Sequence, residues 1–201
     1  RRQRQMCIRD REWLGSQKGL LSWKLDGLTI VLTYEGGELV KAVTRGNGEI
    51  GEVITNNAKV FSNVPLRIPY QGQLILRGEA IIKYSDFARI NEEIEDVDAK
   101  YKNPRNLCSG SVRQLNNEIT AKRSVNFEAF MLVRAVEPEA AAAAGDAVAE
   151  AGLPDDGTDH GRFHNSRKEQ FEWLKTQGFD VVEYKAVSYT HLRAHETSLH
   201  L

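Results

Sequence analysis

The sequence predicts an α+β domain in which mostly antiparallel strands are flanked by helices. Residues 28–44 hold two segments rich in β-branched and aromatic residues, joined by Glu-Gly-Gly-Glu. Paired glycines adopt positive φ at little cost, so the junction reads as a hairpin turn and the strands as an antiparallel meander. A further strand at 73–82 and helices at 85–97 and 103–115 complete the pattern.

Composition limits the class of protein. Of 201 residues, 41% are hydrophobic and 27% charged, which is ordinary for a soluble globular protein. No apolar run approaches the roughly 18 residues of a membrane span, so no membrane partner is expected. Two cysteines give neither a disulfide framework nor a metal quartet, which favours a reducing cytoplasm. The formal net charge of −1 excludes a generally basic nucleic-acid binder, so any such contact must come from locally placed arginines and lysines.

The two ends of the chain look foreign to the rest. Residues 1–11 carry five arginines without helical or strand periodicity, and residues 187–201 carry three of the five histidines. Both resemble translated sequencing-adapter sequence, so we exclude them from fold reasoning. The domain is therefore expected to span 12–186, opening at 12–21 with the end of a helix and a short link.

Histidines near the C-terminus have spacings that suggest metal ligands. His191 and His195 are four residues apart, and His195, Glu196 and His200 come within one residue of the zinc-protease HExxH pattern. The spacing departs from that pattern, and all of these residues lie in the excluded end. We therefore predict no metal site built from protein ligands.

Lys24 lies in the sequence Lys-Leu-Asp-Gly, directly before the strand predicted from Leu28. At the edge of a buried sheet a lysine needs a partner, because burial disfavours the ammonium form, and the neutral amine is a nucleophile toward phosphorus or a carbonyl. Asp26 would lie on the same strand face, close enough to orient the amine or a metal. Taken alone, these four residues favour a solvated lysine before a turn, but the motifs that follow favour the nucleophile.

A glycine-rich segment follows the hairpin at 44–52. Its three glycines within six residues would let the backbone approach a ligand closely and offer N–H groups to phosphate or sugar oxygens. No Gly-Lys-Ser/Thr follows, so the segment is not a P-loop. Next to Arg45 and directly after the hairpin, it indicates a nucleotide pocket, with an ordinary glycine-rich turn as the alternative.

Glu79 stands in the middle of the strand predicted at 73–82, among apolar neighbours. A carboxylate there needs an arginine, a sugar hydroxyl or a metal as its partner. Contact with a ligand is favoured over a structural ion pair, which remains the alternative. Ser85 is the expected N-cap of the helix at 85–97, whose apolar residues recur at steps of three and four.

The segment 103–115 begins as a helix should, with Asn103 as N-cap and Pro104 at the first helical position. Arg105 and Arg113 are eight residues apart, about 80° in rotation and roughly 12 Å along an ideal helix, so both could flank one groove. The small residues at 109–111 leave room for a ligand. A solvated arginine face is the alternative, but guanidinium forks suit phosphate.

The remaining elements close the domain. A strand is predicted at 125–133, and the segment 135–161, rich in alanine, proline, glycine and acidic residues, is expected to be an exposed insertion. The sequence at 166–169 is a capping box for a helix that ends at Gly178. A last strand is predicted to start at 181–184.

Taken together, these segments resemble the adenylation domain of bacterial NAD-dependent DNA ligases. The matching sequences are KLDG at 24–27, TRGNGEIGE at 44–52, LRGE at 76–79, YKNPRNLCSGSVRQL at 101–115 and ITAKRSVNF at 119–127. They occur in the family's order and cover nearly all of 12–186, and the NPRN…SGSxRQL block is specific to the NAD-using branch. The resemblance implies the α+β nucleotidyltransferase fold, incomplete at its C-terminus.

The resemblance also implies a chemistry. Lys24 would attack the α-phosphorus of the AMP half of NAD, release nicotinamide mononucleotide and become lysyl-AMP, with Asp26 and Gly27 completing the motif. AMP would then pass to the 5′-phosphate of a nick in double-stranded DNA, which the 3′-hydroxyl seals in replication and repair. A divalent cation, Mg²⁺, would offset phosphate charge in the transition state.

The other matched residues would bind nucleotide or DNA. Glu79 is similar to the family's ribose-contacting glutamate, and Arg45 to an arginine near the nucleotide. Arg105 and Arg113 match arginines that serve AMP, the nick phosphate or both. The enzyme that the resemblance implies is cytoplasmic and monomeric.

Three departures separate this chain from the family pattern. Ser22 stands where many members have a glutamate, and Val53 stands where an aspartate is usual. The later lysine motifs and the family's other modules are absent from the sequence. We therefore interpret 12–186 as an internal fragment of a ligase, which is expected to be inactive alone.

Three functions remain open from the sequence. The first is a nucleotidyltransferase that forms lysyl-AMP. The second is a non-catalytic nucleotide- or DNA-binding module of the same fold. The third is a structural α+β domain in which Lys24 and Glu79 form an ion pair.

Overall fold

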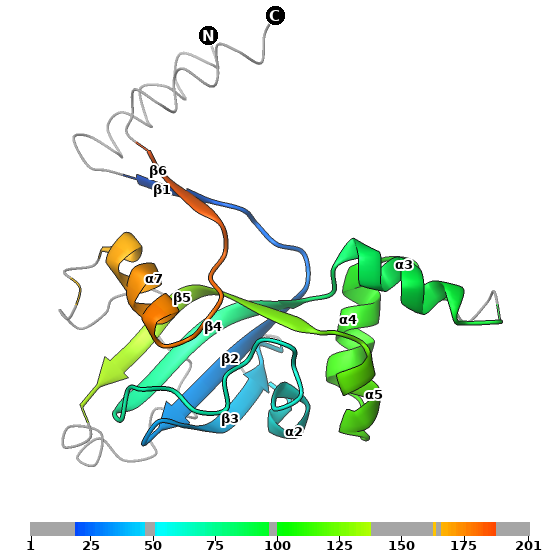
Figure 1. Ribbon diagram of the computed structural model, residues 1–201, viewed down its shortest axis with the longest axis horizontal. Coiled ribbons are helices and arrows are strands. Elements are labelled where there is room, and N and C mark those ends of the chain that lie inside the picture. The colour runs from blue at the N-terminus through cyan, green and yellow to red at the C-terminus, as the bar shows by residue number, and fades with distance from the viewer. Residues whose placement is uncertain (1–18, 47–50, 97–99, 138–162, 164–165, 188–201) are drawn as a thin grey trace, which may run out of the picture. The chain divides into compact units, whose positions relative to one another are not determined.

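The computed structural model describes residues 19–46, 51–96, 100–137, 163 and 166–187 (Figure 1). The chain divides into two units. One, called the sheet unit below, runs from Leu25 to Val182. The other, called the strand-pair unit, holds the described residues up to Lys24 and from Glu183 onward.

The sheet unit is built on four antiparallel strands in the order β3-β2-β4-β5. Their bounds are β2 (Leu28–Glu35), β3 (Glu38–Thr44), β4 (Gln73–Ile81) and β5 (Asn126–Val136). Gly36 and Gly37 join β2 to β3 with φ of 56° and 80°, values that side chains other than glycine's rarely allow. This confirms the predicted hairpin and the predicted antiparallel arrangement.

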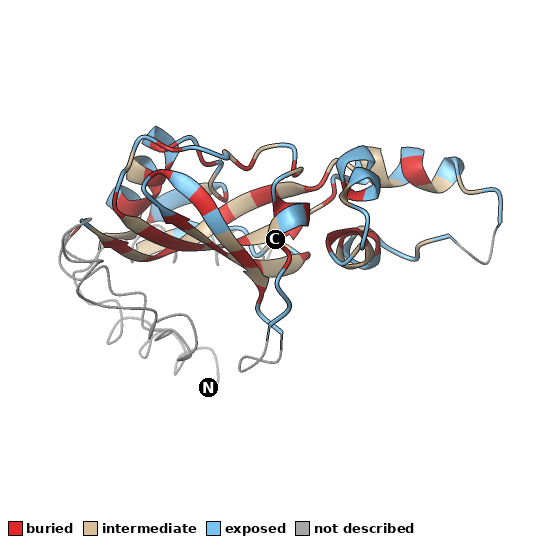
Figure 2. Cartoon of the chain, turned by 90° about the horizontal axis from the view of Figure 1, so that it is seen from below, coloured by how far each residue is buried: buried red, intermediate tan, exposed pale blue. Residues whose placement is uncertain are grey.

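One face of this sheet forms the core. Along β2, the buried residues Ile30, Leu32 and Tyr34 alternate with half-buried ones, as the two-residue period of a strand requires. Figure 2 shows the same alternation of buried and intermediate residues along the strands. Tyr34 donates its hydroxyl to the Pro65 carbonyl at 2.7 Å and meets the Phe179 ring edge-on at 5.4 Å between centroids. Burial raises the pKa of Tyr34, so this hydroxyl stays a donor.

Within the described residues, five helices accompany the sheet. They are α2 (Thr55–Ala58), α3 (Tyr84–Glu92), α4 (Pro104–Val112), α5 (Asn117–Lys122) and α7 (Arg167–Thr176). Figures 1 and 2 show α3, α4 and α5 beyond one end of the sheet, while α7 packs against β5. α4 also contacts β4 and β2, so its side chains lie beside the residues at that end of the sheet.

The predicted helix boundaries hold where a cap defines them. The Asn103 side chain accepts a hydrogen bond from the Asn106 N–H at 2.8 Å, and Pro104 is the first residue of α4. The Ser166 hydroxyl accepts from the Glu169 N–H at 3.4 Å, and Gly178 ends α7's segment with φ of 92°. Both N-caps are therefore confirmed, because each satisfies N–H groups that the first helical turn leaves without partners.

Two predictions about α3 are wrong. Ser85 is not its N-cap, because the helix begins at Tyr84 and Lys83 holds the extended backbone of the cap position without a side-chain hydrogen bond. The helix ends at Glu92 instead of reaching 97. Ile90 is its one buried residue, so the sequence beyond it gains no packed face that would extend the helix.

The strand-pair unit corrects two further predictions. β1 (Gly19–Ser22) pairs antiparallel with β6 (Tyr184–Val187), so Gly19–Ser22 is a strand and not the link after a helix. The last strand starts at Tyr184, and Val181 in the sheet unit makes only an isolated parallel bridge to Ala129. The Trp23 N–H donates to the Glu183 carbonyl at 3.3 Å and its indole to the Glu183 carboxylate at 3.1 Å.

Several predictions concern residues outside the described ranges. Of the expected insertion at 135–161, Ala135 and Val136 continue β5, and 138–162 is outside. Residues 1–11 and 188–201 also lie outside the described ranges. Val187, the first residue of the excluded C-terminal end, is described and pairs with Gly19. Among the described residues, no helix has the length and apolar character needed to cross a membrane.

We predict that Asn103→Ala lowers the free energy of unfolding by about 1 kcal/mol, because the Asn106 N–H at the start of α4 loses its acceptor. Urea unfolding of the chain measures the change. Asn106→Ala is the matched control, since the exposed Asn106 contributes only its backbone N–H to this bond. Equal losses in the two variants would contradict the assignment of the cap.

Candidate active site

Glu79 of β4 is held by the residues that begin β2. Its carboxylate accepts the Gly27 N–H at 3.1 Å on one oxygen and the Thr29 hydroxyl at 2.9 Å on the other. Each oxygen of an ionised carboxylate has a second lone pair, so both can accept another hydrogen bond from a ligand. No arginine pairs with Glu79 in the described part of the chain. A structural ion pair between Glu79 and an arginine is therefore not formed there.

A glycine is required at position 27 because the backbone there lies very close to the backbone of β4. A Cβ built on Gly27 would lie 2.0 Å from the Ala80 carbonyl oxygen, a distance that no real side chain can adopt. The absence of a side chain therefore lets the backbone N–H of Gly27 reach Glu79, one residue along β4.

Asp26 pairs with Arg105 across the sheet unit. The Asp26 carboxylate lies 2.6 Å from an Arg105 terminal nitrogen, and both side chains are exposed. An exposed pair of this kind adds little stability, but it fixes where the Arg105 guanidinium rests. Because Asp26 and Gly27 are consecutive, one short segment contacts both Arg105 on α4 and Glu79 on β4.

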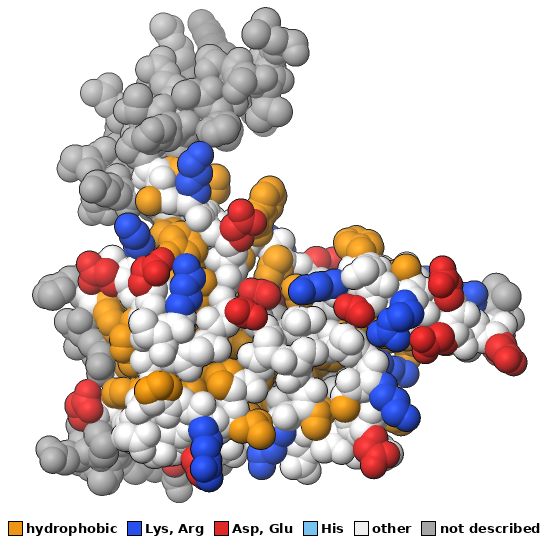
Figure 3. All heavy atoms as spheres, in the orientation of Figure 1, with side chains coloured by type: hydrophobic (Ala, Val, Ile, Leu, Met, Phe, Trp, Pro, Cys, Tyr) orange, Lys and Arg blue, Asp and Glu red, His pale blue; other side chains and the backbone are white. Residues whose placement is uncertain are grey.

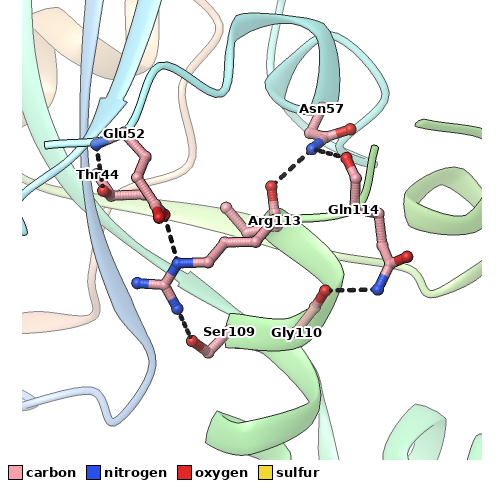
Figure 4. Close-up of polar contacts among 8 residues, drawn as sticks. Thr44, Glu52, Asn57, Ser109, Gly110, Arg113 and Gln114 are labelled. Carbon is pink, nitrogen blue, oxygen red and sulfur yellow. Dashed lines mark hydrogen bonds and ion pairs between the residues drawn. The ribbon is translucent and has the colours of Figure 1, made fainter. Parts of the chain in front are cut away.

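Arg113 occupies the other end of α4 (Figure 4). Its Nε donates to the Glu52 carboxylate and its Nη1 to the Ser109 hydroxyl, each at 2.5 Å. The Glu52 N–H in turn donates to the Thr44 hydroxyl at 3.0 Å, and the Thr44 N–H donates to the Glu52 carbonyl at 3.0 Å. The two ends of the glycine-rich segment are thus joined to each other and to α4.

Arg45 begins the same segment at the end of β3. Its backbone N–H donates to the Thr29 carbonyl at 3.0 Å, and its side chain is exposed. Thr29 also donates its hydroxyl to Glu79. The backbone of Arg45 therefore lies beside a residue of β2 that binds this carboxylate.

Lys24 does not lie where the sequence predicts. Residues 23–26 are outside any strand, and the Lys24 side chain is exposed rather than buried at a sheet edge. The reason is that β1 ends at Ser22 and β2 begins at Leu28, so Lys24 falls in the connection between them. Lys24 belongs to the strand-pair unit and Glu79 to the sheet unit, so its role as nucleophile stays a prediction.

The small residues of α4 divide between two uses. Ser111 is fully buried and donates its hydroxyl to the Leu107 carbonyl at 2.6 Å, so it faces the core and not a ligand. Ser109 accepts from Arg113, and Gly110 lies near the Tyr101 ring. The expectation that all three residues leave room for a ligand is therefore wrong for Ser111.

The carboxylates of the sheet have an unusual arrangement. Glu79 and Glu128 are directly opposite each other on β4 and β5, so their side chains share one face. Desolvation by partial burial, and then the nearby charge of Asp180, raise the pKa of Glu128, while Lys83 opposes the shift. Burial, and then Glu79, raise the pKa of the Cys108 thiol to about 12, and its Sγ donates to the Ala80 carbonyl at 3.1 Å.

Charges elsewhere on the sheet unit are mixed. On the face drawn in Figure 3, basic and acidic side chains are interspersed and do not gather by sign. The described residues include no group of three or more His, Cys, Asp or Glu that would hold a metal. The histidines weighed as ligands, His191, His195 and His200, lie outside the described residues together with Glu196.

Three site residues were missed by sequence reasoning. Thr29 binds Glu79, Glu52 binds Arg113, and Glu128 lies opposite Glu79. Glu52 was part of the glycine-rich motif but had no assigned partner. The other two depend on the register between strands, which the sequence of one strand does not reveal.

We predict that Thr29→Val lowers the free energy of unfolding by about 1.5 kcal/mol, because it removes a hydrogen bond to an ionised carboxylate. Thr29→Ser keeps the hydroxyl and is expected to retain most of that free energy. Urea unfolding at pH 7 compares the two variants. If valine and serine behave alike, the hydroxyl does not hold Glu79.

We predict that Glu128→Gln is more stable than the parent chain at pH 7, and that the difference shrinks as the pH falls. A carboxyl with a raised folded-state pKa costs stability while it is charged, and the cost disappears as pH drops through that pKa toward the ordinary value of 4.5. Denaturation at a series of pH values measures this, with exposed Glu92→Gln as control. A pH-independent difference would contradict it.

The sequence is similar to that of known proteins over most of its length. The sequence model of the NAD-dependent DNA ligase adenylation domain matches residues 7–158. A DNA ligase of Lachnoclostridium phytofermentans is 63% identical over 177 residues, which cover 88% of this chain and 24% of that protein. A DNA ligase of Ruminiclostridium cellulolyticum is 59% identical over 182 residues, or 90% of this chain and 24% of that protein.

A more distant relative shares a shorter part. A DNA ligase of Helicobacter pylori strain P12 is 50% identical over 105 residues, or 52% of this chain and 16% of that protein. The chain thus spans about a quarter of the length of the two more similar relatives. By the match over most of its length, the chain belongs to the NAD-dependent DNA ligase adenylation domain family.

Proposed function

We propose that this chain is the adenylyl-transfer part of a NAD-dependent DNA ligase. One observation carries the proposal: consecutive residues Asp26 and Gly27 contact Arg105 and Glu79, for which the resemblance to the family implies a role in nucleotide binding. The names of the relatives, all DNA ligases, support the same reaction class.

Lys24 is tied to these contacts by the chain itself. Two residues of extended backbone span at most roughly 7 Å, so the Cα of Lys24 stays within that distance of the Cα of Asp26. A short stretch of chain thus links Lys24 to the residue that pairs with Arg105. The exposure of Lys24 leaves it accessible to a substrate.

In the proposed reaction the Lys24 amine, after losing a proton, attacks the α-phosphorus of NAD. The N–P bond forms as the P–O bond to nicotinamide mononucleotide breaks, leaving AMP on the lysine. Arg105 would offer its fork to phosphate oxygens, and Glu79 would accept from a ribose hydroxyl. Arg45 and Arg113 would hold further phosphate oxygens of nucleotide or DNA.

Mg²⁺ fits this site only together with a phosphate substrate. The described residues hold no group of three or more His, Cys, Asp or Glu that could enclose a metal. Mg²⁺, however, is commonly held by one or two carboxylates plus substrate phosphates. Asp26 and Glu79 are two of the carboxylates within the proposed site. When bound, the ion would offset phosphate charge.

The partner of the whole enzyme would be nicked double-stranded DNA, to whose 5′-phosphate the AMP passes. We further propose a cytoplasmic, monomeric enzyme. The free, buried thiol of Cys108 supports a reducing compartment.

A non-catalytic nucleotide-binding module is the second candidate. It is favoured by the position of Lys24, which the structure describes in a connection and exposed.

We predict that residues 12–186, grafted into the matching quarter of the Lachnoclostridium phytofermentans relative, acquire one AMP when incubated with NAD and Mg²⁺. Intact-protein mass spectrometry detects the adduct. Lys24→Arg is expected to abolish it, because guanidinium stays protonated and is a poor nucleophile. Lys59→Arg, on an exposed lysine after α2, is the control and is expected to keep it.

Each outcome separates the candidate functions. An adduct that persists in Lys24→Arg would show that another residue is the nucleophile. AMP binding without an adduct would favour the non-catalytic module. Neither binding nor adduct would leave only a structural role for the domain.

A further inference from the structure

The C-terminal end of α4 is closed by side chains instead of a glycine. Arg113, the C-cap, has φ of −97° and ψ of 12°, so its backbone has left the helix. The last carbonyls of a helix have no partners within it and must find others. Gln114 donates its side-chain amide to the Gly110 carbonyl at 2.8 Å, and the Thr120 hydroxyl donates to the Ser111 carbonyl at 2.7 Å.

Asn57 completes this closure from a separate helix. It lies on α2, is 6% exposed, and donates its side-chain amide to the Val112 carbonyl at 2.7 Å and to the Gln114 carbonyl at 2.8 Å. Figure 4 shows these two bonds reaching the backbone from α2. The two carbonyls belong to the residues immediately before and after Arg113, so Asn57 holds the backbone on both sides of it.

The opposite end of the Arg113 side chain is held as well. Nε is bonded to Glu52 and Nη1 to Ser109. In the part of the chain that the structure describes, Nη2 has no hydrogen-bond partner, so one edge of the guanidinium is available to an oxygen anion. A long side chain magnifies any rotation at its Cα, so this arrangement depends on how firmly the backbone is fixed.

We propose that Asn57 is a positioning residue for Arg113, which it holds by fixing the Val112 and Gln114 carbonyls, and that it thereby sets where Arg113 meets a phosphate. The inference rests on the proposed phosphate role of Arg113. At the C-cap one long turn bond, from the Gln114 N–H to the Ser111 carbonyl at 3.4 Å, is left to the backbone, and the two shorter bonds from Asn57 hold the segment around Arg113. The two carbonyls orient the Asn57 amide, because only its NH2 group can donate to both of them.

The first test is the NMR signal of the Arg113 Nε–H group in the full 201-residue chain. Because this group is bonded to Glu52, it is expected to give a resolved cross-peak that Arg113→Lys removes. Asn57→Ala is expected to move it into the envelope of solvent-exposed arginines. Asn56→Ala, on an exposed neighbour in the same helix, is expected to leave it in place.

The second test is a double-mutant cycle with AMP as the probe. Arg113→Ala and Asn57→Ala are each expected to weaken AMP binding about 10-fold, the size of one lost charge-assisted hydrogen bond. If Asn57 acts through Arg113, the double variant binds no more weakly than Arg113→Ala alone. A purely structural Asn57 would give multiplied losses. Asn57→Ser, which keeps one donor, replaces the alanine variant if that variant does not fold.

The outcomes distinguish this inference from the proposed function. An Arg113 cross-peak unchanged in Asn57→Ala, or multiplied losses in the cycle, would overturn the positioning role and leave the function standing. AMP binding unaffected by Arg113→Ala would also overturn the inference, because Arg113 would then not meet the phosphate. A chain that binds no AMP at all would count against the proposed nucleotide site, and with it the phosphate part of the inference.

Discussion

The antiparallel register between β2 and β4 is the constraint on which the site depends. It places Thr29 opposite Glu79 and Leu28 opposite Ala80. A shift of one residue would turn every side chain of one strand to the other face and would separate Glu79 from the Thr29 hydroxyl. The buried residues of both strands oppose that shift, because it would expose Ile30, Leu32 and Tyr34. Core packing on one face of the sheet thus fixes the polar contacts on the other.

α4 extends this constraint to the arginines. Its first turn carries Arg105, which meets Asp26, and its C-cap is Arg113, which meets Glu52. Asp26 precedes β2, and Glu52 follows β3, so one helix connects the segments at which these two strands enter and leave the sheet. Each of these two arginines is paired with a carboxylate, so both are locally placed basic groups whose charge is partly balanced. A phosphate that approaches either arginine meets a guanidinium of which a carboxylate already holds one part.

Local signals in the sequence predicted much of this fold. The paired glycines at 36 and 37 predicted the hairpin, and Asn103 followed by proline predicted the start of α4. These features depend on neighbours in the chain, so a single sequence contains the necessary information. The same reasoning failed at Ser85. An N-cap residue has an extended backbone, and the residue with that backbone before α3 is Lys83.

Non-local contacts could not be predicted in the same way. That Glu79 binds Gly27 and Thr29 follows from strand register, and that Asn57 binds the end of α4 follows from the packing of two helices. Lys24 was expected at the edge of a buried sheet, but the pairing of β1 with β6 ends at Ser22 and β2 begins only at Leu28. The residue types of the site were visible in the sequence, whereas their partners required the structure.

The pairing of β1 with β6 has a mechanical consequence. Gly19 lies opposite Val187, so the chain enters and leaves the β1–β6 pair at the same end. The hydrogen bonds of an antiparallel pair run perpendicular to the strands. Tension applied through the segments that flank Gly19 and Val187 therefore pulls along those hydrogen bonds and breaks them one after another. The β1–β6 pair would separate under a small force. The four-stranded sheet would bear load only after β1 and β6 had separated.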